Sequence, residues 1–446
     1  DDDREGDAIA WHTGIALNVE FSQNNRIVFH EISENAIKKS LQNIHTIDMN
    51  SVNAQQARRV IDRLVGYTLS PLLWKHIESD RKGLSAGRVQ SCLLAILKEK
   101  DETIRAHIPE KSQECSGQFV NGDTTLKCLY KDTQEQPYDP LSLLENLRDN
   151  REFIVDSVEF SEDKQYPPKP LITSTLQRSA YQRLRFPIKK TMSIAQKLYE
   201  NGKITYMRTD SPTISSEFQA ILCNHIKDTY GPEHYQPSFS KKVKGAQEAH
   251  ECVRVTSLND TLHERYDKDD IALYKLIKEF TICSHLKPAI LNVLTLKLVN
   301  DVATFEGINR VYDYLGYLQY SDNYAIEPQL HLTKGEIFHL NTCRYTDKYT
   351  GYPSHYDEPS IVRTLESSGI GRPSTYASIV ATLANRDYTE RTTVSYEPQE
   401  VLTISLNNKR ITKKLAKQRF PKQSNRIVLT ELGEKVLEYL KTHFGN

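Results

Sequence analysis

The stretch with the clearest chemical potential covers residues 202–211, with the sequence GKITYMRTDS. Here Tyr206 precedes Arg208 by two positions, and in an extended segment two such side chains lie on the same face. A phenol has an unperturbed pKa of about 10, so it is a poor nucleophile at neutral pH. A fixed guanidinium beside it would offset this weakness and would also hold a phosphate through paired hydrogen bonds. The spacing therefore fits a tyrosine nucleophile directed at a phosphodiester, whereas a half-buried strand with an ordinary tyrosine is the plainer alternative.

A second group of candidates lies at the start of the sequence, where carboxylates alternate at Asp1, Asp3 and Glu5. In a strand, or in extended chain leaving one, this spacing puts all of them on one side. Clustered carboxylates repel one another unless a cation lies between them, and hard oxygen ligands suit Mg²⁺. Gly6 would then release the chain into a helix that begins near Ala8. A solvated acidic segment is the alternative interpretation.

Two further segments, LSAGRVQS and GIGRPST, put arginine and small polar residues at the start of an expected helix. Free backbone N–H groups at such a position favour a phosphate, and Pro373 suits the first helical position. The side chains concerned are Arg88, Gln90 and Ser91 in the first segment, and Arg372, Ser374 and Thr375 in the second. Ordinary helix capping explains the same residues without a ligand.

The segment AQEAHECVR carries His250 and Arg254 four positions apart, so a helix would put both on one face. Such a pair could contact phosphates on either side of a reacting bond. Glu251 in the same segment and Asp210 after the tyrosine are further polar candidates. A single histidine is equally well explained by a structural role.

In order along the chain, these stretches resemble the type IA DNA topoisomerases. GKITYMRTDS is similar to the active-site segment of that family. The other matching stretches are DDDREGDAIAWH, VNAQQARRVIDRLVGY, LSAGRVQS, AQEAHECVR and GIGRPSTYASIVATLANRDY, which together run from residue 1 to residue 388. Met207 after the tyrosine is more similar to bacterial topoisomerase I than to topoisomerase III, which tends to have proline there. Cys252 and Val255 depart from the alanine and proline that are common in the family.

The resemblance implies relaxation of negatively supercoiled DNA without ATP, and no GxxxxGK[ST] nucleotide-binding signature is present. Tyr206 would form a 5′-phosphotyrosine intermediate, Arg208 would stabilise the phosphate, and Asp1, Asp3 and Glu5 would hold Mg²⁺ for religation. The remaining candidates would contact single-stranded or underwound double-stranded DNA: Arg88, Gln90, Ser91, Asp210, His250, Glu251, Arg254, Arg372, Ser374 and Thr375.

The family also has a glutamate and a lysine on an earlier strand of its toprim domain, and no residue here can be assigned to either. We therefore expect a core fragment that lacks the start of the toprim domain and any zinc-ribbon tail. One alternative is a protein that binds single-stranded DNA and has lost catalysis with that glutamate. Another is a toprim nuclease or primase-like protein, which would need no tyrosine.

The expected fold is multidomain, of the α/β plus α+β class, because 446 residues are too many for one core. A partial toprim domain, winged-helix-like helical domains and a discontinuous β-arch would form a toroidal gate. The expected ranges are 1–45 for the toprim part, 46–102 with 357–446 for a helical DNA-binding domain, 103–166 with 291–356 for the β-arch, and 167–290 for the tyrosine domain. Residues 173–210 and 360–392 both resemble a helix-turn-helix with a β wing.

Apolar periodicity predicts two helices. Residues 54–78 should begin near Asn53 and break or restart at Pro71. The apolar residues expected on its buried side are Ala57, Val60, Ile61, Leu64 and Val65. The helix after LSAGRVQS should bury Val89, Cys92, Leu93, Ile96 and Leu97.

Composition gives no overall sign of a nucleic-acid partner, because 58 basic residues balance 58 acidic ones. Contact with DNA must come from a local patch, and a basic cluster comprises Lys409, Arg410, Lys413, Lys414, Lys417, Arg419 and Lys422. The 7 cysteines form no CxxC pair, which indicates reduced thiols and no encoded zinc ribbon. No apolar run is long enough to cross a bilayer, so we expect no membrane association. We also expect a monomeric, cytoplasmic protein that is associated with DNA.

Overall fold

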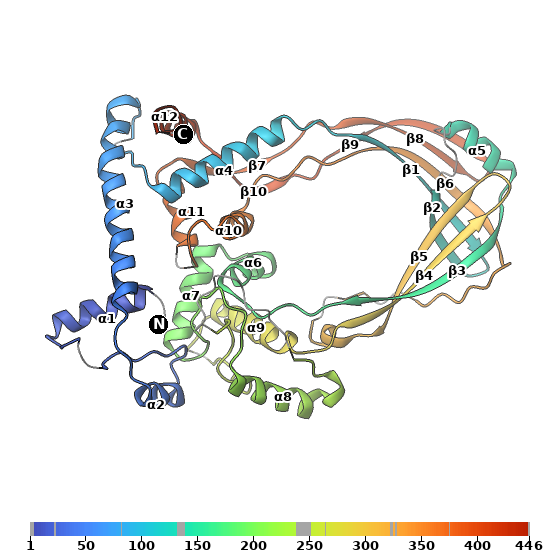
Figure 1. Ribbon diagram of the computed structural model, residues 1–446. Coiled ribbons are helices and arrows are strands. Elements are labelled where there is room, and N and C mark those ends of the chain that lie inside the picture. Colours follow the sequence, from blue (N-terminus) through green and yellow to red (C-terminus); the bar gives the residue numbers. More distant parts are fainter. Residues whose placement is uncertain are drawn as a thin grey trace.

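The computed structural model describes residues 4–21, 24–81, 83–131, 139–237, 251–263, 265–321, 324–325, 328–373 and 375–444. The fold is mixed α/β with several parts. In Figure 1 a helical part and a β-barrel lie on opposite sides of an open ring, joined by an upper and a lower arm. No helix within the described ranges has both the length and the apolar composition needed to span a membrane.

The barrel forms because its strands pair in a closed antiparallel order. That order is β1 (Lys111–Asn121), β2 (Thr124–Lys131), β5 (Thr304–Tyr314), β4 (Ala289–Val299), β3 (Glu152–Gln165) and β6 (Ile337–Tyr349), after which β6 pairs with β1 again. Closure leaves these strands without unpaired edges. Alternate side chains point inward, and Phe119, Phe153 and Phe305 meet edge to face with ring centroids 4.9–5.6 Å apart. The strands expected at 115–120, 125–130 and 291–299 are confirmed.

Helix α5 (Pro140–Asp149) packs on this core with Leu143, Leu144 and Leu147 buried. Its first turn is capped by Asp139, whose carboxylate accepts a hydrogen bond from the Ser142 N–H at 2.9 Å. Strands β8 (Gln399–Asn407) and β9 (Arg410–Gln418) extend the sheet from β6. This pairing corrects one expectation, because these strands fall in the range 357–446 that we had assigned to a helical domain.

The helical part has its own apolar core. It contains α3 (Met49–His76), α4 (Arg88–Arg105), α10 (Glu358–Ser367), α11 (Tyr376–Asn385) and α12 (Glu431–Phe444), with the two-stranded sheet β7 (Thr389–Val394) and β10 (Gln423–Leu429). α10, α11 and the β7–β10 pair match the expected helix-turn-helix and wing. The Tyr388 hydroxyl ties this unit to the segment before α4, since it donates to the Ser85 carbonyl oxygen at 3.1 Å.

Helix α3 differs from its prediction. Asp48, not Asn53, caps it by accepting from the Asn50 N–H, and Pro71 lies inside the helix without ending it. The expected buried stripe is on the surface, where Val60 is 54% and Leu64 is 61% exposed. The reason is tertiary, because α3 stands at the margin of the helical part (Figure 1) and buries only Val52, Ser70 and Leu73 among its residues.

Helix α4 also has a shifted apolar face. It buries Leu93, Leu94, Leu97 and Ile104, with Val89 and Ile96 partly covered. Cys92, expected inside, is exposed. The true core stripe is rotated toward Leu94, because the core of the helical part lies on that side.

The segment with Tyr206 belongs to a third core, which is inserted between β3 and β4. It is built from α6 (Thr173–Leu184), α7 (Ile188–Glu200), α8 (Ser216–Tyr230) and α9 (Lys268–Cys283), with short 3₁₀ turns η1 (Pro232–His234) and η2 (Gly316–Tyr320) nearby. Gln165 at the end of β3 pairs with Ala289 at the start of β4, so the insert leaves and rejoins the barrel at one hydrogen-bonded position. The remaining helices, α1 (Arg4–Ala16) and α2 (Glu34–Gln42), precede α3.

The burial of α5 gives a stability prediction. Leu147→Ala would leave a cavity in the barrel core, because Leu147 is fully buried, and it should lower the free energy of unfolding by about 2–5 kcal/mol. Leu141→Ala on the same helix removes a side chain at its exposed side and should cost less than about 1 kcal/mol. Calorimetric unfolding of both variants checks this, and equal losses would show that α5 does not pack as described.

Candidate active site

Tyr206 and Arg208 line one cavity of about 430 Å³, as their spacing predicted. The opposite wall is helix α7, which contributes Lys189, Met192, Ser193, Gln196 and Tyr199. Between the two site residues, Met207 points the other way and is fully buried in the core of the insert. The alternation of an extended segment therefore puts the phenol and the guanidinium on the cavity side and anchors the intervening residue.

The two side chains differ in environment. Tyr206 is only 6% exposed, and its ring meets the ring of Tyr199 edge to face with centroids 5.2 Å apart. Burial raises the pKa of Tyr199, so this second phenol stays protonated at neutral pH. Arg208 is exposed, and within the described part of the chain it pairs with no carboxylate. An arginine in that state can bind an incoming anion without first losing a protein partner.

The segment 204–209 is not part of a regular sheet, so its backbone groups need other partners. Thr173, the first residue of α6, supplies several of them. Its hydroxyl donates to the Met207 carbonyl oxygen at 2.7 Å and accepts from the Thr209 N–H at 2.8 Å. Its own N–H donates to the Thr209 carbonyl oxygen at 2.9 Å. One buried threonine thus fixes the chain on either side of Arg208.

Thr205 fixes the other end of the segment. Its N–H donates to the Arg254 carbonyl oxygen at 2.9 Å, and its hydroxyl donates to the Cys252 carbonyl oxygen at 2.6 Å. The next N–H, of Tyr206, donates to the His30 carbonyl oxygen at 2.8 Å. The tyrosine is therefore held directly by backbone from the N-terminal part of the chain, which no local sequence pattern indicated.

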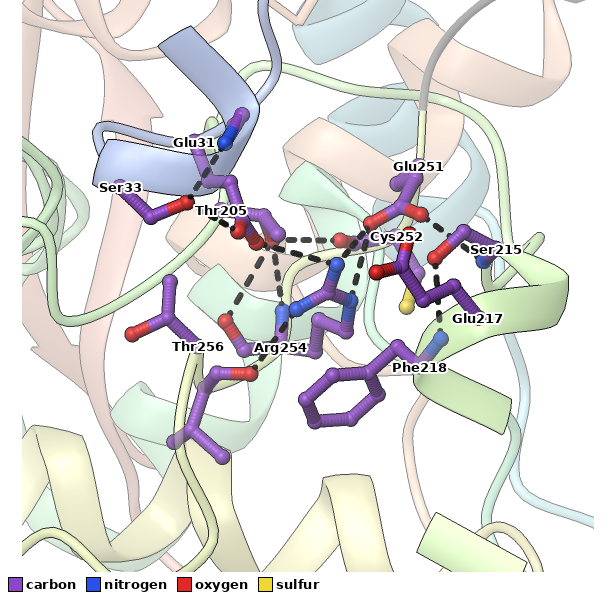
Figure 2. A network of polar contacts seen from close by, with 12 residues as sticks. Glu31, Ser33, Thr205, Ser215, Glu217, Phe218, Glu251, Cys252, Arg254 and Thr256 are labelled. Carbon is purple, nitrogen blue, oxygen red and sulfur yellow. Dashed lines mark hydrogen bonds and ion pairs between the residues drawn. The ribbon is translucent and has the colours of Figure 1, made fainter. Parts of the chain in front are cut away.

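Arg254 is the centre of the polar network drawn in Figure 2. Its guanidinium lies 2.5 Å from a Glu251 carboxylate oxygen and 3.1 Å from one of Glu31, and it donates to the Val255 carbonyl oxygen at 3.2 Å. It also stacks on the Phe218 ring, 3.9 Å from its centroid, and is 4% exposed. These partners satisfy a buried charge from several sides.

This arrangement corrects the expected helix at AQEAHECVR. Residues 251–256 are extended and form isolated β-bridges from Val253 to Leu171 and from Val255 to Ile204. His250 lies outside the described residues. Glu251 and Arg254 are paired with each other, so their contact with DNA stays a prediction, and their observed role is to connect the tyrosine segment to the N-terminal part.

A close backbone approach completes that connection. Gly202 has φ +66°, and a Cβ atom there would collide with the Ile32 carbonyl oxygen. Nearby, Lys39 of α2 forms an ion pair with Glu217 of α8, and this lysine lowers the pKa of the Glu217 carboxyl. A cavity of about 850 Å³ lies between the same two parts, and its lining includes Glu31 and Arg254.

The carboxylates expected to hold Mg²⁺ are only partly described. Glu5 lies in the first turn of α1, so it is helical and not in the extended segment that we expected, and Asp1 and Asp3 lie outside the described residues. Asp7, two residues later in the same turn, is paired with Arg26 at 3.1 Å. No group of three or more possible metal ligands occurs among the residues that the structure describes. The half-buried Glu5 carboxylate is a donor of the type that suits Mg²⁺.

The candidates at the start of α4 lie together in its first turn. Arg88 donates to Asp62 of α3 at 2.8 and 2.9 Å, so a protein carboxylate already holds it. Gln90 and Ser91 are half-buried in the same turn, after Gly87 at the N-cap. The expected cluster of polar groups at a helix start is therefore present, with the arginine directed at α3.

The second phosphate candidate differs in detail. α11 begins at Tyr376, so Pro373 precedes the helix and does not occupy its first position. Arg372 is exposed, and Thr375 closes a tight turn with it, accepting from the Arg372 N–H at 2.9 Å. Ser374 lies outside the described residues. Asp210 is close enough to Tyr376 to add to the burial that raises the pKa of this tyrosine to about 12.

Sequence reasoning missed several residues of the site. Lys189, Ser193 and Gln196 recur at intervals of three and four, so the polar face of α7 was a readable signal. Thr173 and His30 gave no such signal, because both act through hydrogen bonds to residues that are distant in the sequence. The wing expected after α7 is also absent as a regular strand, since Ile204 forms only an isolated bridge.

Comparison with known proteins places this geometry in a family. Residues 46–409 match the family model described as DNA topoisomerase. The structure is similar to that of full-length topoisomerase I from Thermotoga maritima, with 31% sequence identity and a TM-score of 0.81. The similarity covers 100% of this chain and 70% of the Thermotoga chain.

The approach of Gly202 to Ile32 can be tested by substitution. Gly202→Ala combines a strained positive φ with a collision, so it should separate the N-terminal part and raise the hydrogen-exchange rate of the Tyr206 amide at least about tenfold. Gly369→Ala is the matched control, because Gly369 has φ +67° with no atom within 4 Å of its added Cβ. Equal exchange rates in the two variants would mean that the Tyr206–His30 hydrogen bond does not depend on this contact.

Proposed function

This chain belongs to the type IA DNA topoisomerases, and from that premise we propose that it relaxes negatively supercoiled DNA by breaking and resealing one strand. The observation that carries the proposal is the cavity in which the Tyr206 phenol and the exposed Arg208 guanidinium lie on one wall. A nucleophile and a fixed cation side by side are what attack on a phosphodiester requires.

In the cleavage step, the Tyr206 oxygen attacks phosphorus and the bond from phosphorus to the 3′ oxygen breaks. A 5′-phosphotyrosine link forms, the phenol loses its proton, and the leaving 3′ oxygen takes one up. Arg208 stabilises the negative charge that develops on the phosphate oxygens. The link retains the energy of the phosphodiester, so the 3′ hydroxyl can reverse the reaction without ATP.

The segment around Tyr206 is anchored on the side away from the cavity. Met207 in the core and Thr173 at the backbone hold Tyr206 toward the cavity, beside Arg208. Because the segment is pre-positioned, little conformational entropy is lost when DNA enters.

Magnesium fits the chemistry of the acidic residues at the start of the chain. Glu5, with Asp1 and Asp3, would hold Mg²⁺, which would supply positive charge that positions the broken 3′ end for religation. Arg26 neutralises Asp7, whereas Glu5 in the same turn forms no ion pair with a cation of the described residues.

The substrate of the cleavage step is a single strand, which underwound duplex provides. Lys189 and Gln196 of α7 would follow the backbone beside the reacting phosphate. Arg372 and Thr375, together with Ser374, Gln90, Ser91, Asp210 and His250, would contact the strand further away, mostly at phosphates. Recognition of base sequence should be slight, since such contacts carry no sequence information.

Substitution of the nucleophile tests the cleavage step directly. Tyr206→Phe removes the attacking oxygen, so no covalent adduct should form with a single-stranded oligonucleotide and Mg²⁺, while DNA affinity changes less than about threefold. Tyr199→Phe is the matched control in the same cavity and should retain adduct formation. Denaturing gel electrophoresis of labelled oligonucleotide measures the adduct. If the unaltered protein binds DNA without forming one, it is a single-strand-binding protein; if Tyr206→Phe still cleaves, a nuclease mechanism replaces this one.

Substitution of Arg208 separates an effect on the rate of adduct formation from an effect on DNA affinity. Arg208→Ala should slow adduct formation about 10²–10³-fold, as expected for loss of a group that stabilises developing charge, with a much smaller change in DNA affinity. Lys189→Ala removes another cation of the same cavity and should have the smaller effect on rate. Single-turnover cleavage kinetics distinguish the two, and a loss confined to affinity for Arg208→Ala would argue against its role at the phosphate.

A further inference from the structure

The outer face of the barrel wall has a polar array that the proposed cleavage does not use. In β1, Ser116 and Gln118 alternate with buried residues, and in β6, Thr342 and Arg344 do the same. Side chains at directly paired positions lie on the same face of a sheet. The register of β2, β1, β6, β8 and β9 therefore determines which side chains form continuous rows across this wall.

The rows are mostly polar, with one exposed apolar side chain, Leu129. One row contains Lys127, Gln118, Thr342, Asn407 and Arg410; the next contains Leu129, Ser116, Arg344, Ser405 and Thr412; a third contains Glu114, Thr346, Thr403 and Lys414. A concavity of about 670 Å³ lies over the middle of these rows, and Lys127, Arg344 and Lys348 are in its lining. We call this surface the outer polar face.

Cations dominate the outer polar face. Lys127, Arg344, Lys348, Arg410 and Lys414 are all exposed. Glu114 pairs with Lys348 at 2.5 Å, and at the margin Glu306 of β5 pairs with Lys131 at 3.3 Å. In the described part of the chain, Lys127, Arg344 and Lys414 pair with no carboxylate. Hydroxyl and amide side chains lie between these cations, in the mixture that proteins use to contact phosphates.

The dimensions and composition favour duplex over single-stranded nucleic acid. Five strands spaced about 4.8 Å apart span about 19 Å, close to the combined width of the two grooves of B-DNA. The rows contain no aromatic side chain, and single strands are normally bound by stacking bases on aromatic rings. A surface of spaced cations and hydroxyls instead suits the regular phosphates of a duplex.

We propose that the outer polar face is a second DNA site, which binds the phosphate backbone of double-stranded DNA without reading its sequence. The proposal rests on the proposed function in that DNA is the substrate, but it needs no chemistry at Tyr206. β1, β6, β8 and β9 run along the upper arm that joins the barrel to the helical part (Figure 1), so a duplex held there stays tethered to the enzyme.

The test is a charge-removing triple variant, Lys127→Gln with Arg344→Gln and Lys414→Gln. Fluorescence anisotropy with a blunt 24-base-pair duplex should show at least about tenfold weaker binding at 0.1 M salt. The slope of log affinity against log salt should become shallower by about 2.7, as expected for loss of three phosphate contacts. The matched control removes equal charge at exposed positions elsewhere, by Lys268→Gln with Lys334→Gln and Lys441→Gln, and should change affinity less than about twofold.

The outcomes separate this proposal from the proposed function. Adduct formation on a 12-nucleotide single strand should be the same in the triple variant and the unaltered protein. Unchanged duplex affinity, or an equal loss of affinity for oligo-dT, would overturn the duplex site even if adducts form. Absence of adducts from the unaltered protein would instead contradict the cleavage mechanism alone.

A measurement on the unaltered protein tests the same site even if the triple variant does not fold. Lys127 and Lys414 should be protected from chemical acetylation by the same duplex, as read by mass spectrometry of the digested protein. Lys268 should not be protected. Equal labelling of these lysines with and without duplex would overturn the proposal.

Discussion

The constraint on which the rest depends is that the chain around Tyr206 must satisfy its backbone groups without a sheet. Buried N–H and C=O groups are costly when unpaired, and here the pairing comes from Thr173 and from the carbonyl oxygens of Arg254 and His30. The start of α6, the extended residues 251–256 and the N-terminal part are all positioned by the same requirement. Because no strand pairs with the segment on its cavity side, the space beside Arg208 stays open, whereas a neighbouring strand would fill it.

The sequence predicted what depends on local spacing. The shared side of Tyr206 and Arg208 and the barrel strands follow from period-two alternation, which the backbone itself enforces. Prediction from the sequence failed where contacts with residues distant in the chain determine the structure. Periodicity showed that α3 has an apolar stripe but not what covers it, and the helix expected around Arg254 gave way to bridges with Leu171 and Ile204. Strands β8 and β9 likewise joined the barrel through pairing with β6, about sixty residues earlier in the chain.

The ion pairs of Arg254 connect the tyrosine core to the N-terminal part. Its partners come from different places, because Glu251 lies on the same short segment and Glu31 lies on the N-terminal part. A buried charge is strongly destabilising when it loses every partner. If the N-terminal part moves away, Arg254 keeps Glu251 and its stacking on Phe218, so the step is far less unfavourable than breaking an isolated buried pair.

The junction of the insert with the barrel has a mechanical consequence. Since the chain departs at Gln165 and returns at Ala289, which are paired in the sheet, both covalent connections of the tyrosine core to the barrel lie in one two-stranded ribbon. Bending or twisting of that ribbon would tilt the core relative to the barrel, and the contacts of the core with His30 and Glu31 of the N-terminal part would oppose such a movement.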